Sequence, residues 1–431
     1  MTDYPTAQTI VEEMQQGSAV KVLEACLARI REREPVIGAW EYLNPNALVQ
    51  AQYCDRVRSQ GKVLGTLHGV PVGIKDTFAT VDMPTGWGTP IHQGRQFGYD
   101  AAVVERLKAA GAVIVGKTVT TEYAIARPNK TRNPHNPEHT PGASSSGSAA
   151  AVADGMVPIA IGTQMVGSTL RPAAYCGIFG FKPSFGVISR YGLMPSSREL
   201  DCVGIFGRSI ADIDLVLSVL AGIDPRDPDC YGTLITPPPR KNHLKFALIL
   251  SSQWYQIKDE AKQVLFDSVT TLTAAGATVS QVDLPSEFDA YLDRVDILCA
   301  TGIAANHGAD YDLYAQKMSS KLQQLIVRGR NVDAIAYSQA RHAVVEYNIT
   351  LAKIFSEFDA ILTPVTTGTA PYGLENTGSP VFCALWTLCG LPAISIPVGM
   401  SNGLPLGIQL VGKRLCDREL LEIAQFLHSL A

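Results

Sequence analysis

The chain of 431 residues has neither an excess of positive charge nor a long hydrophobic run. Its 36 lysines and arginines against 40 aspartates and glutamates give a formal net charge of -4, so it offers no bulk attraction to nucleic acid or to an anionic membrane surface. No apolar stretch reaches the roughly 18 residues of a membrane span, and the N-terminus lacks a basic end followed by an apolar run. We therefore expect a cytoplasmic protein without nucleic-acid or membrane partners.

Paired-cysteine motifs are also missing. The nine cysteines are odd in number, scattered and never spaced as C-x-x-C, which favours reduced, buried thiols over a disulfide framework or a zinc site. His135 and His139 stand four residues apart, but Asn136-Pro137 between them argues against the helix that would bring both to one metal. We expect no metal site.

Helix-like and strand-like patterns alternate along most of the chain. Residues 7–34 resemble two amphipathic helices, and "GVPVGIK" is an apolar strand that ends at Lys75. A helix is expected from an Asp100 cap to Gly111, followed at once by a strand over 112–115. "SSSGSAAAVADG" is typical of a helix opened by serines and closed at a glycine, and "VPIAIGTQ" of the next buried strand.

The same pattern returns in the second half of the chain, in "EAKQVLFDSVTTLTAAGATVSQVDL". "DAILTP", "PAISIPV" and "GIQLVG" are strand candidates before a last helix over 417–430. This alternation predicts an α/β fold with a large twisted, mixed or parallel sheet covered by helices on both faces.

We see no internal repeat, and the one linker-like segment is the proline-rich stretch 224–242. The expected organisation is an N-terminal helical cover over 1–60, a catalytic core over 61–225, and a C-terminal part of the same α/β domain over 226–431. Within the last part, the helical region 280–360 is expected to shape substrate access.

The stretch from Pro141 to Pro183 places serines on glycine turns, as a nucleophile site would, yet it contains no histidine and no G-x-S-x-G motif. A serine in this stretch needs another base, and a lysine made neutral by burial or by neighbouring cations can supply one. Lys75 is the candidate, because it ends an apolar strand where α/β sheets present functional groups.

"GIKD", "GASSSGSAAAVA" and "GTQMVGSTLRPAAYCGIFGFKPS" together resemble the amidase signature family, whose members hydrolyse amides with a Ser-cisSer-Lys triad. The likeness is strongest over about residues 60–215, and "DAILTP" with "CGLPAISIPVG" is similar to the family's C-terminal part. The resemblance implies Lys75 as the base, Ser144 as a bridging serine on a cis peptide bond, and Ser168 as the nucleophile. It implies no cofactor.

The resemblance also implies roles for the residues around the nucleophile. The backbone N–H groups of Met165, Val166 and Gly167 would face the oxyanion of the tetrahedral intermediate. Gln164 would contact the substrate or orient this loop. Arg171 follows Ser168 by three residues, as in malonamidase-like members that bind a substrate carboxylate; the alternative is that it pairs with an internal acid.

One position departs from the family pattern. The family usually has two glycines before the nucleophile, and here Val166 replaces the first. If that position needed a positive φ, a β-branched residue would fit poorly; the other consequence would be a narrowed acyl pocket that favours small substrates. The neighbouring Ser145, Ser146 and Ser148 are more typical of helix capping or of support for the catalytic loop.

The predicted function is hydrolysis of a small carboxylic amide, such as a malonamate-like compound, to acid and ammonia. Three alternatives stay open. The chain could be an aryl- or indoleacetamide amidase, with Trp87, Phe97 and Trp386 lining a pocket rather than the core. It could be the A-type subunit of a tRNA-dependent amidotransferase, which requires partner chains, or a degenerate member that binds amides without turnover. The expected partner is a small-molecule amide, and a homodimer is an open assembly.

Overall fold

The computed structural model describes residues 4–14, 16–125, 127–232, 234–235 and 243–430, so the linker-like stretch 224–242 lies partly outside the described residues. The described strands form one sheet in the order β1-β3-β2-β4-β6-β5-β10-β11-β9-β7-β8. Their bounds are β1 (Trp40–Leu43), β2 (Pro71–Lys75), β3 (Val113–Thr118), β4 (Ile159–Gln164), β5 (Phe179–Lys182), β6 (Cys202–Gly207), β7 (Lys245–Leu248), β8 (Thr278–Gln281), β9 (Ala360–Pro364), β10 (Ala393–Ser401) and β11 (Leu404–Val411).

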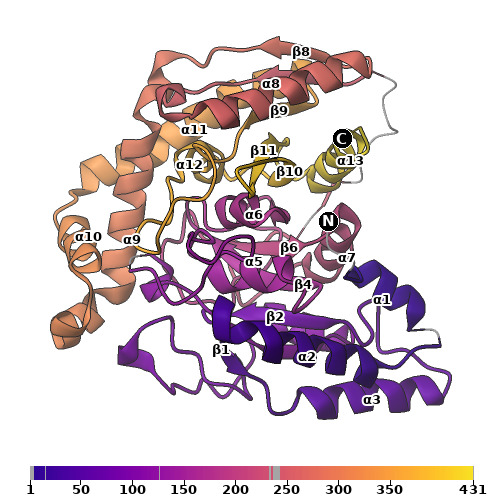
Figure 1. Cartoon of the computed structure of the whole chain (residues 1–431). Coiled ribbons are helices and arrows are strands. Elements are labelled where there is room, and N and C mark those ends of the chain that lie inside the picture. The colour runs from indigo at the N-terminus through magenta and orange to yellow at the C-terminus, as the bar shows by residue number, and fades with distance from the viewer. Residues whose placement is uncertain (1–3, 15, 126, 233, 236–242, 431) are drawn as a thin grey trace.

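The helices surround this sheet (Figure 1). Their bounds are α1 (Ala7–Glu13), α2 (Ala19–Ile37), α3 (Ala47–Ser59), α4 (Ala102–Ala109), α5 (Ser146–Ala153), α6 (Leu170–Cys176), α7 (Ile210–Leu220), α8 (Asp259–Ala274), α9 (Tyr291–Tyr314), α10 (Ser320–Arg330), α11 (Ala334–Glu357), α12 (Val381–Leu388) and α13 (Asp417–His428).

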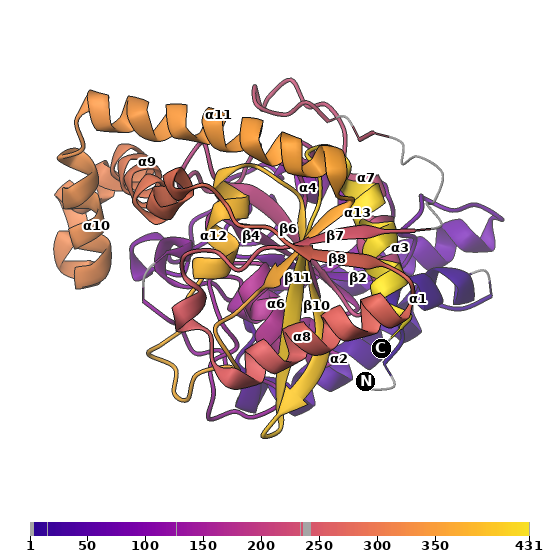
Figure 2. The same cartoon turned by 90° about the horizontal axis from the view of Figure 1, so that it is seen from above.

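The sheet is mixed, as predicted. β2 pairs parallel with β3 and β4, and β7 pairs parallel with β8 and β9, whereas β4, β6, β5, β10, β11 and β9 pair antiparallel in succession. Seen from above, the strands fan out around a common centre because the sheet is strongly twisted (Figure 2).

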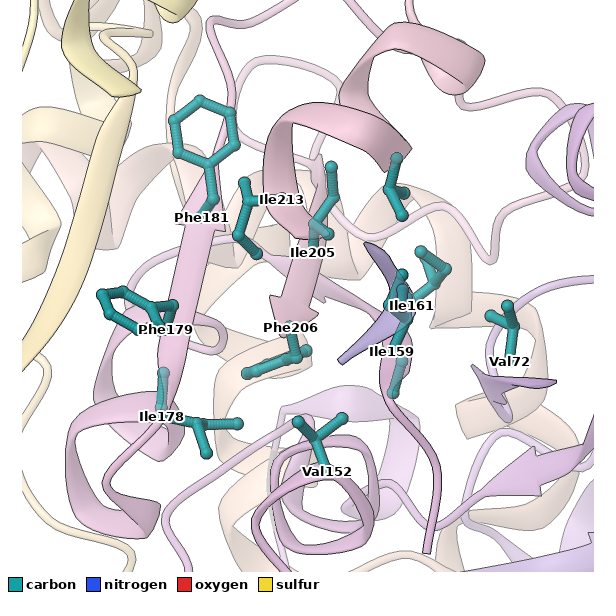
Figure 3. Packing of buried hydrophobic residues seen from close by; sticks show 14 of the residues in the cluster. Val72, Val152, Ile159, Ile161, Ile178, Phe179, Phe181, Ile205, Phe206 and Ile213 are labelled. Carbon is teal, nitrogen blue, oxygen red and sulfur yellow. The ribbon is translucent and has the colours of Figure 1, made fainter. Parts of the chain in front are cut away.

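Apolar side chains on both faces of the sheet form the core. Figure 3 shows Val152 of α5 below and Ile213 of α7 above the strand that carries Ile205 and Phe206. All four side chains are at most 1% exposed. Burial on both faces explains why these strands have nearly continuous apolar sequences, and the predicted α/β fold is confirmed.

One predicted helix start is wrong, and for the other the structure decides between the two alternatives. The N-cap of α4 is Ala101, and the Asp100 carboxylate instead accepts from Val81 N and from Lys108 Nζ, both at 2.9 Å. The N-cap of α5 is Ser145, but its side chain makes no capping hydrogen bond. Its hydroxyl donates instead to the carbonyl of Thr163, 3.1 Å away.

Region 280–360 is largely helical, as expected; α9 and α10 project to one side of the molecule, and α11 runs from that side back toward the sheet (Figures 1 and 2). Residues 1–60 contribute more than helices, since β1 forms one edge of the sheet. All nine cysteines are free and buried. Within the residues the structure describes, no helix is both long enough and apolar enough to cross a membrane.

Candidate active site

Lys75 is the last residue of β2, and its side chain is 0% exposed. Its Nζ lies 2.6 Å from Thr163 Oγ1, 2.8 Å from Ser144 Oγ and 3.0 Å from Ser145 Oγ. Thr163 comes from β4, which runs parallel to β2, and the two serines lie at the start of α5. Three hydroxyl oxygens therefore surround the amine.

The charge state of this amine follows from its surroundings. Burial lowers the pKa of Lys75 well below that of an exposed lysine, and the nearby Asp201 opposes this shift only in part. Among the described residues, no carboxylate lies within 4 Å of Lys75 Nζ. Hydroxyl groups solvate an amine but do not neutralise an ammonium ion, so the site favours neutral Lys75 with a free lone pair.

The hydroxyl groups around Lys75 are not equivalent. Ser145 donates its proton to Thr163 O at 3.1 Å and accepts from Thr163 N at 3.2 Å, so its oxygen can only accept from Lys75. Ser144 Oγ has no other hydrogen-bond partner among the described residues. Its proton is therefore free to be donated to the lone pair of Lys75.

The segment that presents Ser144 has an unusual backbone. The peptide bond between Ala143 and Ser144 is cis, and the preceding Gly142 has φ +84°. A Cβ at Gly142 would lie 2.8 Å from Pro172 Cα, so a side chain there would collide with α6. Glycine is required because the backbone needs both the positive φ and the close approach.

The loop after β4 carries Ser168 and is held by Gln164. The Gln164 Oε1 accepts from Thr169 N at 2.8 Å and from Leu170 N at 3.0 Å, while its Nε2 donates to Thr387 Oγ1 at 2.9 Å. Gln164 is 0% exposed. Both ends of the Gln164 amide therefore bind protein groups. The side chain orients the loop and does not make the predicted substrate contact.

The backbone of this loop leaves donors available. Within the part of the chain that the structure describes, the N–H groups of Met165, Val166, Gly167 and Ser168 have no hydrogen-bond partner. A Cβ at Gly167 would lie 2.8 Å from Pro380 Cβ, so the glycine lets the loop pass close to the start of α12. Val166 is not among the described residues with positive φ, and the conflict expected for a β-branched residue does not arise.

Ser144 and Ser168 line the same small cavity, together with Thr163, Met165 and Asp201. Its volume is about 10 Å³, roughly the space of one water molecule. The structure thus brings the predicted base, the bridging serine and the predicted nucleophile together. It also adds Thr163 to the hydroxyl groups around Lys75.

Arg171 lies outside this cavity lining and is 6% exposed. Its Nη2 donates to Ala143 O at 2.7 Å, and its Nη1 donates to Gly378 O. These acceptors are backbone carbonyls, so the expected internal acid is not the partner of Arg171 among the described residues. The guanidinium instead ties the Ala143–Ser144 peptide to the loop before α12.

The tryptophans proposed to line a pocket are buried. Trp386 is 1% exposed within α12. Trp87 is 8% exposed and packs on Phe97 with ring centroids 6.0 Å apart. Neither tryptophan nor Phe97 lines the cavity that contains Ser168.

Sequence reasoning did not identify Thr163 and Asp201 as site residues, and for Ser145 it left open helix capping or support of the catalytic loop. Thr163 could have been found from the strand pattern, since Ile74 and Ile161 are opposite each other in parallel strands. Lys75 comes one residue after Ile74 and Thr163 two residues after Ile161, so both lie at the same edge. Asp201 has no such local signal.

Comparisons with known proteins agree with this geometry. A family model described as Amidase matches residues 21–421. The A-type subunit of the glutamyl-tRNA(Gln) amidotransferase from Symbiobacterium thermophilum is 34% identical over 452 aligned residues, which cover 94% of this chain and 92% of that protein.

Solved structures share the whole fold. The peptide amidase of Stenotrophomonas maltophilia has a TM-score of 0.84 at 28% identity, and the alignment covers 98% of this chain and 96% of the amidase chain. A chain from a vestigial protein complex, studied for the origins of an s-triazine catabolic enzyme, has a TM-score of 0.91 at 26% identity. That alignment covers 99% of this chain and 98% of the other chain. The match over nearly the entire length, and the site built on its signature segments, show that the chain belongs to the amidase signature family of amide-hydrolysing enzymes.

Proposed function

We propose that the chain hydrolyses a small primary carboxamide to acid and ammonia through an acyl-enzyme on Ser168. The observation that supports this most directly is the hydroxyl-lined environment of Lys75, whose Nζ lies 2.8 Å from Ser144 Oγ. A buried neutral lysine is a competent base for a serine nucleophile, and the cavity shared by Ser144 and Ser168 gives the proton a short route.

In the proposed acylation, Ser168 Oγ bonds to the carbonyl carbon as its proton passes to Ser144 Oγ. The Ser144 proton passes at the same time to the lone pair of Lys75 Nζ. The carbonyl π electrons move onto the oxygen, which gives a tetrahedral oxyanion and a Lys75 ammonium. The C–N bond then breaks, and the proton returns through Ser144 to the leaving nitrogen, which departs as ammonia.

Deacylation repeats the same steps with water as the nucleophile. Water loses a proton to Lys75 through Ser144, and its oxygen bonds to the acyl carbon. The bond to Ser168 Oγ then breaks, and the proton returns to Ser168 as the acid is released. In both steps we propose that the N–H groups of the Met165–Ser168 loop, which have no partner among the described residues, stabilise the oxyanion, where one donor is worth about 3 kcal/mol.

The substrate is proposed to be short because Val166 stands where the family usually has a glycine before the nucleophile, which narrows the space for the acyl group. The prediction of a malonamate-like substrate depended on Arg171 binding the carboxylate of the substrate. Because Arg171 already donates to Ala143 O and Gly378 O, we propose that it shapes the Ser144 segment instead. The small size of the acyl group is then the main selective feature.

A second candidate function is the A-type subunit of a tRNA-dependent amidotransferase. Several curated relatives that are 33–34% identical have that name. In this case the same Ser168 chemistry would release ammonia from a free amide, but it would need partner chains for full activity. The two functions differ in whether the isolated chain turns over.

The test is ammonia release by the purified chain, measured across malonamate, propionamide, glutamine and an arylacetamide. The proposed function predicts turnover of the short amides without added protein, abolished in Ser168→Ala and retained in Ser146→Ala, whose hydroxyl makes only a 3.4 Å contact with Val119 O. Turnover of glutamine alone, and only with a partner subunit, would favour the amidotransferase. Undiminished turnover in Ser168→Ala would refute both.

A further inference from the structure

Asp201 is a partly buried carboxylate that the proposed proton route does not use. It immediately precedes β6, whose first residue, Cys202, is opposite Gln164 at the end of β4. Because the two strands are antiparallel, Asp201 lies beside Met165, at the edge of the sheet where the Ser168 loop begins. The register of the sheet therefore places Asp201 at the same edge as the start of the Ser168 loop.

The carboxylate has a fixed orientation. One oxygen, Oδ2, accepts from Ser196 N at 2.7 Å and from Ser197 N at 2.9 Å. Two backbone N–H groups favour the ionised form of a buried carboxyl group. Asp201 also lines the cavity of Ser144 and Ser168, and it is the only acid among the described residues that do so.

Lys75 needs a compensating charge at one moment of the reaction. Neutral Lys75 is stable among its three hydroxyl groups, but the ammonium that forms during acylation is buried without an ion-pair partner within 4 Å among the described residues. A carboxylate at the wall of the same cavity lowers the cost of that ammonium through space. At this separation it does not hold the proton itself.

We propose that Asp201 is the electrostatic positioning residue of Lys75, whose carboxylate stabilises the transient ammonium form of the base. The inference rests on the proposed function, because it takes Lys75 as the proton acceptor. The proton still moves between Ser168, Ser144 and Lys75, and Asp201 neither gains nor loses one.

The other ionisable groups around Asp201 do not supply the charge that compensates the Lys75 ammonium. Arg190 lines a neighbouring cavity together with Asp201 but is ion-paired with Asp227 at 3.1 Å and Asp229 at 2.6 Å. The neighbouring thiols of Cys202 and Cys299 have pKa values raised by burial, so they stay uncharged. Glu199, two residues before Asp201, receives a hydrogen bond from Tyr337 and does not line the cavity. Burial raises the pKa of Asp201 to about 6, so its charge is present at neutral pH.

The test uses p-nitrophenyl acetate, which reports serine acylation by release of p-nitrophenolate whatever the natural substrate is. The rate is measured against pH for wild type and for two neutral variants, Asp201→Asn and Asp201→Ser. The active form of Lys75 is neutral, and a nearby negative charge raises the pKa of a lysine. Removing that charge should move the acid limb of the profile about 1 pH unit lower and reduce the plateau rate about tenfold, since a weaker base remains.

A matched control is Asp417→Asn. Asp417 likewise accepts two short hydrogen bonds, both at 2.7 Å, from Ser184 N and Ser184 Oγ, but it is 0% exposed and does not line the cavity. The pH profile of Asp417→Asn should keep the wild-type midpoint. Asp201→Glu keeps the carboxylate, so the midpoint of its profile should return toward the wild-type value.

The outcomes separate this inference from the proposed function. Acylation that persists fully in Ser168→Ala would refute the proposed function. Acylation that depends on Ser168, but with a wild-type pH midpoint in either folded neutral variant of Asp201, would refute the role of Asp201 alone. A lower rate without a shifted midpoint would also refute it, since loss of structural support predicts that result.

Discussion

Lys75 Nζ and Ser144 Oγ lie 2.8 Å apart in a fully buried part of the sheet edge. The lysine has hydroxyl groups for neighbours rather than a carboxylate, so its burial is not repaid by an ion pair. A stable fold retains such a lysine only as the neutral amine, and a neutral amine beside a serine hydroxyl is a base. The activity of the site therefore depends on this relationship and on the contacts that hold it.

The pH profile of acylation should follow the deprotonation of Lys75. Burial lowers the pKa of Lys75 well below its ordinary value, and only the neutral form accepts a proton. The rate should therefore rise with pH and reach a plateau below the pKa of about 10.4 of an exposed lysine. Steady-state rates across pH test this, and a profile that stays flat from acid to alkaline pH, with chemistry limiting, would contradict it.

Replacing Arg171 should affect all substrates alike. Arg171→Ala removes the hydrogen bonds to Ala143 O and Gly378 O, each worth about 1.5–3 kcal/mol because the donor is charged. We expect kcat/KM to fall tenfold or more for malonamate and for neutral propionamide. A loss confined to malonamate would restore the carboxylate-binding role of Arg171.

The orientation of the Ser168 loop should depend on Thr387. Its hydroxyl contacts Val166 O at 2.8 Å and Gln164 Nε2 at 2.9 Å. Thr387→Val keeps the shape but leaves buried groups unsatisfied, at about 1–3 kcal/mol. We expect a roughly tenfold lower kcat with little change in KM, because the loop acts on the transition state.

Thr363→Val is the matched control for Thr387→Val. Thr363 is also buried, and its hydroxyl donates to Ile249 O at 2.8 Å, away from the Ser168 loop. The Thr363→Val variant should be less stable than wild type but should keep the wild-type kcat. Equal kcat losses in both variants would show that the Thr387 effect is a general loss of packing.

The predicted stability at acid pH depends on His307. Burial lowers the pKa of His307 to about 4 from an ordinary 6.5, so between these values the unfolded chain binds a proton that the folded chain does not. Stability therefore falls as pH drops through this window. From pH 7.5 to 5, His307 should account for about 2 kcal/mol of that loss.

Urea unfolding of wild type and His307→Gln at both pH values tests this contribution. The variant should lose about 2 kcal/mol less than wild type on acidification. If the two proteins lose the same free energy, the low pKa of His307 is not responsible for the acid sensitivity.

Lys75 was a candidate from its position at a strand end, whereas Ser144 and Ser168 were assigned through the resemblance to the amidase signature family; the structure brings the three residues close together. The contacts of Arg171 and Gln164 could not be predicted, since their partners Gly378 and Thr387 lie 207 and 223 residues away along the chain. Such contacts depend on how α12 packs against the Ser168 loop. For the same reason, short strands such as β5, with glycine in "FGFK", become recognisable only from their neighbours in the sheet.

The central claim is that Ser168 carries the acyl group. The most direct measurement is peptide mass analysis of enzyme quenched in acid during the first turnover of p-nitrophenyl acetate. We expect one acetyl group on the peptide that contains Ser168 in wild type, and none in Ser168→Ala or within the same time in Lys75→Met. An acetyl group on another residue of a fully active enzyme, or an unmodified Ser168 while p-nitrophenolate is released, would contradict the account.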